Sequence, residues 1–292
     1  MLSRFYSYIT ARDLQNEMRG LSNYLLSCCV NTLLQTLSAT WELSGLLERW
    51  DSAGVRADSH NVPLELKKVL SAMKSDHRHN TPHRDFLNCL DRNNFRLCVQ
   101  HDADEVFLSI LNFMQQQMDD KALALEIQKL YKVSVETRLQ CLECSCIQTQ
   151  TSFQLSLHLH VKEDHNSLEG CISSFLEDQE LRGRDCCFCA QCERKTPSKR
   201  DVKLLSLPRI LCMHLKRYRS SRGGIRKLDC RVTFPETFDF SEIARGGFSR
   251  DFAQVSWERV QGTYGKYYGG TAYMLMYRRS SKEEGRQPEF SG

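Results

Sequence analysis

The sequence predicts an α+β fold in which helices come first and strands follow. Between residues 28 and 120, apolar residues recur at steps of three and four, which is the spacing of helices that bury one face. From residue 132 the pattern changes to an alternation of apolar and polar residues, which is typical of half-buried strands. With 292 residues, of which 41% are hydrophobic, the chain is long enough to bury a sizeable core.

Three helices are expected in the first half of the chain. The first begins near Cys28 and runs to about residue 48, and the second covers 62–73. The third follows Asp102, which can cap it, with Glu105 at the spacing of a capping box. The polar segment 74–84 is expected to form a solvated loop, although it offers three candidate metal ligands, His77, His79 and His83.

Strands and one short helix are expected after residue 131. Residues 132–161 alternate in two halves, the second at 153–161, and a short helix is expected over 167–176. Residues 204–218 contain a nearly continuous apolar run, which predicts a central strand of a sheet. We interpret the histidines of these strands as surface or structural groups: His158, His160 and His214.

Cys28 lies where the first helix is expected to begin, after a polar, turn-prone segment. The positive end of the helix dipole and the unpaired N–H groups of the first turn favour a thiolate there, so the pattern indicates a nucleophilic cysteine. Asn23, five residues upstream, could offer its side-chain amide to an oxyanion that forms at this sulfur. The alternative is that Cys28 and Cys29 form a buried pair at the start of a core helix.

Two C-x-x-C pairs predict a metal site. Cys141 and Cys144 form the first pair, Cys189 and Cys192 form the second, and 44 residues lie between them. Each pair suits one edge of a tetrahedral four-sulfur site, so we expect one structural zinc ion with no open position for chemistry. The exact ligand set stays open, because three further cysteines lie close by in the sequence: Cys146, Cys186 and Cys187.

Charge and composition exclude several classes of protein. The net charge is only +4, from 40 basic and 36 acidic residues, which does not indicate a nucleic-acid or anionic-membrane partner. No apolar run is long enough to span a bilayer, and the first residues lack the apolar core of a signal peptide. Fourteen cysteines without a secretion signal indicate a reducing compartment, so we expect a cytoplasmic protein, with the nucleus as the alternative.

Two segments resemble landmarks of the ubiquitin-specific proteases. Residues 20–35, GLSNYLLSCCVNTLLQ, resemble the cysteine box of that family, and QHDADE at 100–105 is similar to its QQDAxEF motif. The first resemblance implies that Cys28 is the nucleophile and that Asn23 contributes to the oxyanion hole. His101 lies at a Gln position of the second motif, on a supporting helix, and is not expected to be a general base.

The resemblance also implies a papain-like architecture within a single protease domain at 20–292, after a lead-in at 1–19. In that architecture a zinc-bearing fingers region lies between two others, and Cys189 with Cys192 fits the family's zinc site better than Cys186 with Cys189. The implied regions are a helical thumb at about 20–120, β-rich fingers at about 131–203 and a β palm at about 204–292.

The histidine that the family uses as a base has no counterpart here. In the family it lies late in the chain, in a Gly-His-Tyr box, and a later Asp or Asn orients it, whereas the last histidine of this chain is His214. Only residues 244–254, ARGGFSRDFAQ, separate the segments that resemble the landmarks on either side, and Asp251 within them has no imidazole to orient. At ~3.3 Å per residue these eleven residues cannot form the missing strands. We therefore expect a palm that lacks the His-box strands and leaves strand 204–218 exposed.

The implied reaction is hydrolysis of the isopeptide bond between the C-terminal glycine of ubiquitin, or of a ubiquitin-like modifier, and a target lysine. The overall spacing, the short N-terminus and the segments CFCAQCERKT and VSWERVQGTYG resemble those of the interferon-induced member, which removes an interferon-stimulated ubiquitin-like modifier. Because losing the base of a triad costs on the order of a millionfold in turnover, we expect an inactive or very weak enzyme. The alternative is a non-catalytic module that binds a ubiquitin-like modifier or a signalling receptor. Dispersed basic residues argue against nucleic acid as a partner.

Overall fold

The computed structural model describes residues 21–24, 27–52, 60–74, 83–96, 101–221, 224–240, 256–260 and 272–280. These residues fall into two compact units. The first unit comprises the described residues up to Leu130 together with Val260, and the second comprises the remaining described residues from Tyr131 onwards. Among the described residues, no helix is both long enough and apolar enough to cross a membrane.

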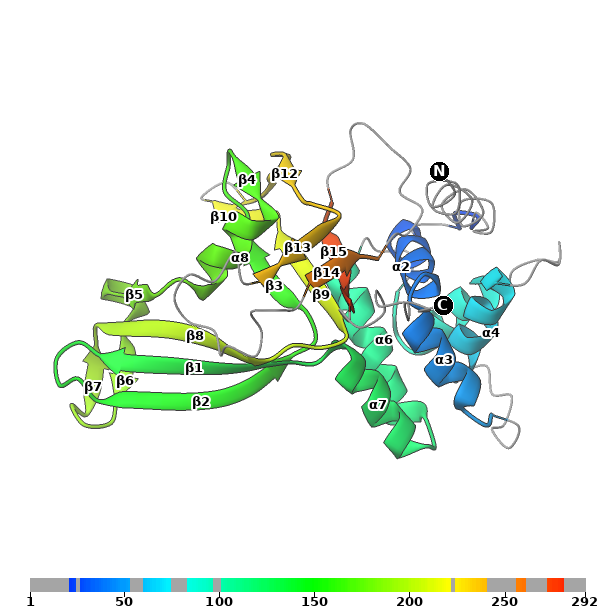
Figure 1. The fold of residues 1–292 in the computed structure, drawn as a ribbon, viewed down its shortest axis with the longest axis horizontal. Helices are drawn as coiled ribbons and strands as arrows, with labels where there is room; N and C mark the ends of the chain where they lie inside the picture. The colour runs from blue at the N-terminus through cyan, green and yellow to red at the C-terminus, as the bar shows by residue number, and fades with distance from the viewer. Residues whose placement is uncertain are drawn as a thin grey trace, which may run out of the picture. The chain divides into compact units, whose positions relative to one another are not determined.

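The first unit is helical (Figure 1). Helices α2, α4 and α6 pack against one another, and each buries a stripe of Leu, Val, Ile, Phe and Met side chains at helical spacing. The helices are α2 (Cys28–Ser38), α3 (Trp41–Arg49), α4 (Val62–Lys74), α5 (His83–Arg92), α6 (Ala103–Gln117) and α7 (Lys121–Tyr131). The predicted helices at 62–73 and after Asp102 are confirmed, and the Asp102 carboxylate accepts a hydrogen bond from the Asp104 N–H at 2.8 Å.

The prediction of a single helix over 28–48 is wrong, because the chain forms two helices there, α2 and α3. The break lies at Ala39 and Thr40. The hydroxyls of Thr36 and Thr40 donate to the carbonyls of Thr32 and Thr36, at 3.1 and 3.0 Å. Such local bonds compete with the helical ladder and favour its interruption.

The segment 74–84 is also only partly as expected. Residues 75–82 lie outside the described residues, so the structure says nothing of His77 and His79. His83 is not part of a solvated loop: it is the first residue of α5 and only 5% of its surface is exposed.

The second unit contains two main sheets. In the first, the strand order is β2-β1-β8-β5, and Figure 1 shows β1, β2 and β8 as long ribbons with the β6–β7 hairpin at one end. In the second, the order is β13-β14-β15-β9-β3. The strands of the first sheet and the hairpin are β1 (Val133–Cys141), β2 (Ile147–Gln154), β5 (Gln179–Leu181), β6 (Cys187–Cys189), β7 (Arg194–Thr196) and β8 (Ser198–Ser206).

The second sheet encloses β9, in which five of the seven residues are buried. Its strands are β3 (Leu157–His160), β9 (Ile210–Lys216), β13 (Thr237–Asp239), β14 (Ser256–Arg259) and β15 (Met274–Ser280). Two-stranded pairs are formed by β4 (Asn166–Ser167) with β12 (Val232–Thr233) and by β10 (Tyr218–Ser221) with β11 (Gly224–Lys227). The predicted central strand is confirmed in β9.

Three strand predictions need correction. The run 204–218 is divided at Leu207 and Pro208, because proline has no N–H for a sheet ladder. The run 153–161 is divided between two sheets after Gln154. The expected exposure of the palm strand is not found, because β15 and β3 pair with β9 on both sides. Residues 244–254 lie outside the described residues.

Helix α8 (Leu168–Leu176) covers part of the second unit's core, and the 3₁₀ turn Gly183–Asp185 lies outside that core. The Ser167 hydroxyl caps α8 by accepting the Gly170 N–H at 3.1 Å, which confirms the short helix predicted there. The core joins α8 to both sheets and consists mainly of aliphatic side chains, among them Val133, Leu159, Ile172, Leu204, Leu211, Leu215 and Tyr277.

Candidate active site and metal centre

Cys28 is the first residue of α2 and its side chain is exposed to solvent. The prediction that a helix begins there is confirmed. Ser27 precedes it at the N-cap position, where a serine hydroxyl commonly accepts a hydrogen bond from the first helical turn. Here the Ser27 side chain makes no such bond. The thiol of Cys28 therefore lies at an N-terminus whose N–H groups carry no side-chain cap.

The Ser27 hydroxyl instead contacts the segment that leads into the helix. It accepts a hydrogen bond from the Tyr24 N–H at 3.0 Å and donates one to Oδ1 of Asn23 at 3.0 Å. The Ser27 N–H donates to the Tyr24 carbonyl at 3.2 Å. The amide of Asn23 is therefore held through its oxygen, and its NH₂ group does not take part in these bonds.

Two side chains hold the same segment through the carbonyl of Ser22. Nε2 of His83 donates to it at 3.0 Å from α5, and Nδ2 of Asn31 donates at 3.1 Å from α2. The rings of Tyr24 and His83 also lie close together, with centroids 5.1 Å apart and planes tilted by 31°. The sequence prediction missed this contact because helical periodicity does not show which distant segment a buried polar residue meets.

Cys29 is chemically different from its neighbour. It is half-buried, and its thiol donates to the carbonyl of His101 at 3.1 Å. Burial, followed by the neighbouring Cys28 and Asp102, raises the pKa of Cys29 to about 11. Cys29 is therefore a thiol at neutral pH, and the alternative of two buried cysteines does not hold, because Cys28 is exposed.

His101 is engaged locally. Its Nε2 donates to the Arg96 carbonyl at 2.6 Å, its Nδ1 lies 3.6 Å from the Glu105 carboxylate, and its ring lies 4.1 Å from that of Phe95. One ring nitrogen thus faces a backbone carbonyl and the other faces a carboxylate of α6. These contacts agree with the prediction that His101 supports the structure and is not a general base. Asp251 lies outside the described residues.

The two predicted cysteine pairs meet at the end of the long sheet. The sulfurs of all four cysteines lie within 4.8 Å of one another, with Cys141 3.9 Å from Cys192 and Cys144 3.5 Å from Cys189. The first pair lies at the end of β1 and in the turn after it, and the second lies on the β6–β7 hairpin. The ligand set left open by the sequence is therefore resolved, and the other nearby cysteines lie outside the group: Cys146, Cys186 and Cys187.

The two turns have the same backbone feature. The residue directly after the second cysteine of each pair has a positive φ, 60° at Ser145 and 52° at Glu193. This left-handed conformation is uncommon for residues other than glycine. The Glu143 N–H points at the sulfur of Cys141 at 3.4 Å, and Glu143 forms an ion pair with Arg194, which joins the two turns. The backbone of both turns is thus shaped around the sulfurs.

The surroundings of the sulfurs favour binding of a cation. The Thr196 hydroxyl, 3.2 Å from the Cys141 sulfur, lowers the pKa of Cys141 to about 6 together with nearby backbone N–H groups. Contact with Cys144, burial and the other two sulfurs raise the pKa of Cys192 to about 12. Four crowded sulfurs can all be thiolates only beside a cation, and four thiolates in this arrangement are the donor set of structural zinc. The four cysteines are positioned to bind a metal, as predicted.

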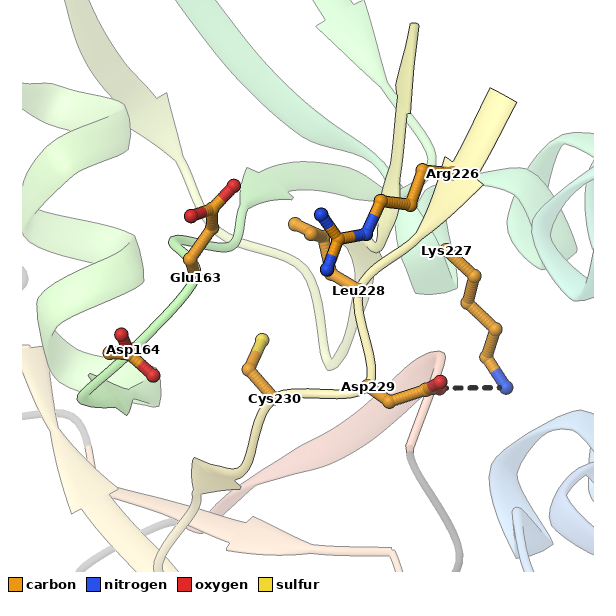
Figure 2. Close-up of a pocket in the computed structure, with 7 residues that line it drawn as sticks. All are labelled: Glu163, Asp164, Arg226, Lys227, Leu228, Asp229 and Cys230. Atoms are coloured by element: carbon orange, nitrogen blue, oxygen red, sulfur yellow. Dashed lines mark ion pairs between the residues drawn. The ribbon is translucent and has the colours of Figure 1, made fainter. Parts of the chain in front are cut away.

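The second unit also contains a polar pocket of about 450 Å³. Figure 2 shows the guanidinium of Arg226 and the sulfur of Cys230 turned toward its interior, and Lys227 paired with Asp229 at 3.1 Å. The buried Arg217 donates hydrogen bonds to the backbone carbonyls of two residues that line the pocket, Leu228 and Cys230. The sequence analysis did not anticipate this pocket.

Comparison with known proteins identifies the family. A family model described as ubiquitin carboxyl-terminal hydrolase matches residues 19–277. The chain belongs to the ubiquitin carboxyl-terminal hydrolase family. The resemblance found in the cysteine box and in the QHDADE segment is thereby confirmed.

Members of this family and one solved structure match most of the chain. Ubl carboxyl-terminal hydrolase 18 of Homo sapiens is 27% identical over 321 residues, which cover 91% of this chain and 86% of the relative. Its counterpart in Mus musculus is 29% identical over 239 residues, or 80% of this chain and 65% of the relative. A chain in the structure of the SAGA Ubp8/Sgf11/Sus1/Sgf73 DUB module bound to ubiquitin aldehyde matches with a TM-score of 0.73 and 19% identity, over 91% of this chain and 70% of that chain. The predicted α+β protease fold is confirmed.

Proposed function

We propose that this chain binds ubiquitin or a ubiquitin-like modifier through a thiol-protease fold and hydrolyses its conjugates very slowly or not at all. The observation that carries the proposal is the family match over residues 19–277, with an exposed Cys28 at the start of α2 and no histidine after His214. The first two features supply a nucleophile, and the third removes the usual base.

In the proposed reaction, the sulfur of Cys28 attacks the carbonyl of the modifier's C-terminal glycine. The NH₂ group of Asn23 donates to the oxyanion that forms, because its amide oxygen is already bonded to Ser27. Collapse of this intermediate requires a proton for the departing lysine amine, which a histidine normally provides. His101 does not fill this role, since Arg96 and Glu105 occupy its ring nitrogens.

The modifier is proposed from the relatives. The human and mouse relatives are both Ubl carboxyl-terminal hydrolase 18, and the structural neighbour is bound to ubiquitin aldehyde. The sequence resemblance favours an interferon-stimulated modifier over ubiquitin itself. The metal would hold the two cysteine turns together through Cys141, Cys144, Cys189 and Cys192, and it would supply no chemistry because all four positions are filled.

A second candidate function is binding without catalysis, of a modifier or of a signalling receptor. The observation that favours it is that β9 keeps strand neighbours on both sides and the four-cysteine group is complete, while the base is missing. The chain therefore keeps the architecture of the sheet and of the metal centre, although it lacks the base that catalysis requires.

The test is release of a C-terminal fluorophore from ubiquitin and from the interferon-stimulated modifier, with binding of both measured separately. We expect binding of at least one modifier and almost no release, with any release abolished by Cys28→Ala. Release at an ordinary protease rate that depends on Cys28 would refute the slow-enzyme proposal, and absence of binding would refute both candidate functions.

A further inference from the structure

The N-cap serine of α2 bonds in the opposite direction from most N-cap serines. Such a hydroxyl commonly satisfies an N–H of the helix that follows it. The hydroxyl of Ser27 instead bonds backward to the Tyr24 N–H and to Oδ1 of Asn23, each at 3.0 Å. Ser27 itself is fully buried, whereas its two partners, Asn23 and Tyr24, are exposed.

The hydrogen bond from the Ser27 hydroxyl to Oδ1 of Asn23 decides which end of the Asn23 amide faces a ligand. An asparagine amide has an oxygen that accepts and an NH₂ group that donates, and only the NH₂ group can stabilise an oxyanion. Because Ser27 holds the oxygen, the NH₂ group makes no hydrogen bond with the residues that the structure describes and remains for a ligand. Without the hydroxyl, nothing in these bonds would stop the amide from turning over and presenting its oxygen, which would repel an oxyanion.

His83 fixes the backbone on the other side of Asn23. A carbonyl only accepts hydrogen bonds, so the contact at 3.0 Å with the Ser22 carbonyl requires a proton on Nε2 of His83. Asn31 donates to the same carbonyl at 3.1 Å, which uses both of its lone pairs. The residues immediately before and after Asn23 are thus each tied to a helix.

We propose that Ser27 and His83 are positioning residues that hold the Asn23 amide with its NH₂ group available to the oxyanion formed at Cys28. This inference rests on the proposed function, in which Asn23 stabilises that oxyanion. Ser27 sets the orientation of the amide, and His83 sets the position of the backbone that carries it.

The test compares two forms of one modifier, ubiquitin with a C-terminal aldehyde and ubiquitin with its native carboxylate, and repeats the pair with the interferon-stimulated modifier. On addition to the aldehyde, the bond from sulfur to carbon forms and the thiol proton ends on the former carbonyl oxygen. The adduct needs no oxidant and no departing amine, so it does not depend on the missing base. The oxygen of the adduct lies where the oxyanion would form, so the ratio of the two dissociation constants measures the hydrogen bond that Asn23 donates to it.

We expect Cys28→Ala to abolish the advantage of the aldehyde and Asn23→Ala to reduce it by about tenfold, the contribution of one hydrogen bond. Ser27→Ala and His83→Phe should each reduce it by up to about tenfold, because each residue acts only through that bond of Asn23. Ser27→Ala and His83→Phe should weaken binding of the native carboxylate form much less than binding of the aldehyde. Ser27→Thr and His83→Gln, which keep a hydroxyl and an N–H donor, should restore most of the advantage.

The proposal is overturned if Ser27→Ala and His83→Phe keep the wild-type ratio, or if they weaken both forms equally. If the unmodified chain binds neither modifier, the proposed function fails, and the side-chain ¹⁵N relaxation of Asn23 decides the positioning claim. A more mobile amide in Ser27→Ala than in the unmodified chain would support the claim, and equal mobility would overturn it.

Discussion

Replacing the buried Arg217 by methionine should destabilise the second unit strongly. Only 2% of the Arg217 surface is exposed, yet within the part of the chain that the structure describes its guanidinium bonds to backbone carbonyls and forms no ion pair with a carboxylate. Its Nε donates to the Ala272 carbonyl at 2.6 Å, and its Nη1 donates to the carbonyls of Cys230 at 2.7 Å and Leu228 at 3.3 Å. The guanidinium thus joins the chain before β15 to the chain after β11.

The expected loss follows from these three bonds. Hydrogen bonds to a charged group contribute about 1.5–3 kcal/mol each, and methionine would leave the three carbonyls without this donor. Relief of the cost of burying the charge offsets part of the loss, which leaves roughly 3–5 kcal/mol. Since whole domains are stable by about 5–15 kcal/mol, the variant should lose a large share of its stability.

The assay is urea unfolding and thermal melting, with Arg219→Met as the matched control. Arg219 has the same chemistry two residues away, but it is half exposed and its ion pair with Glu163 is 3.8 Å long. The control should shift the free energy of unfolding by less than about 1 kcal/mol, as an exposed pair would. Arg217→Met should lower the melting temperature by roughly 10 °C. Equal shifts for the two variants would show that the three carbonyl bonds do not stabilise the fold.

Three further predictions concern other parts of the chain. Cys141→Ser should weaken zinc binding by at least about 100-fold, measured by competition with a coloured chelator, whereas Cys146→Ser, in the same turn but outside the group, should leave affinity unchanged; equal losses would refute the ligand set. Iodoacetamide should alkylate Cys28 faster than Cys29 at pH 7, with Cys29 reacting fast only near its pKa of about 11; mass spectrometry of the labelled peptides would show the reverse order if the distinction were wrong. The indole N–H of Trp50, 2.7 Å from Asp119, lowers the pKa of that carboxyl below its ordinary value of 3.8, so its contribution is present above pH 3.8 and is lost as the pH falls through the lower, folded value. Asp119→Asn should therefore be less stable than the unmodified chain at pH 6 but not at pH 2, and a constant difference between urea midpoints across that range would contradict the assignment.

Sequence patterns were sufficient where a local rule controls the structure. The capping residue Asp102 located α6, the continuous apolar run located β9, and the spacing of the two C-x-x-C pairs identified the sulfurs that meet in the metal centre. Each of these signals acts within a few residues or through a fixed ligand geometry. The helix α7 was missed although its apolar residues, Leu123, Ala124, Ile127 and Leu130, follow the same helical spacing.

Sequence patterns did not predict the features that depend on contacts between residues far apart in the chain. Nothing in the sequence near His83 indicates that its ring reaches the carbonyl of Ser22, 61 residues away. The Thr196 hydroxyl beside Cys141 and the carbonyl partners of Arg217 are likewise brought together only by strand pairing. Periodicity also cannot show that an alternating run such as 153–161 changes sheets, because both halves keep the same alternation.

Capture of a modifier and release of its target depend on different groups in this chain. Addition of sulfur to a carbonyl requires Cys28 and a donor for the oxyanion, and Asn23 is held with its NH₂ group unoccupied by Ser27. Departure of an amine requires a proton donor, and no histidine follows His214. A chain that keeps the first set of groups and lacks the second should form an adduct with a modifier aldehyde yet fail to release a fluorophore. Measuring both on one preparation separates loss of the base from loss of the binding surface, because only the second would also abolish the adduct.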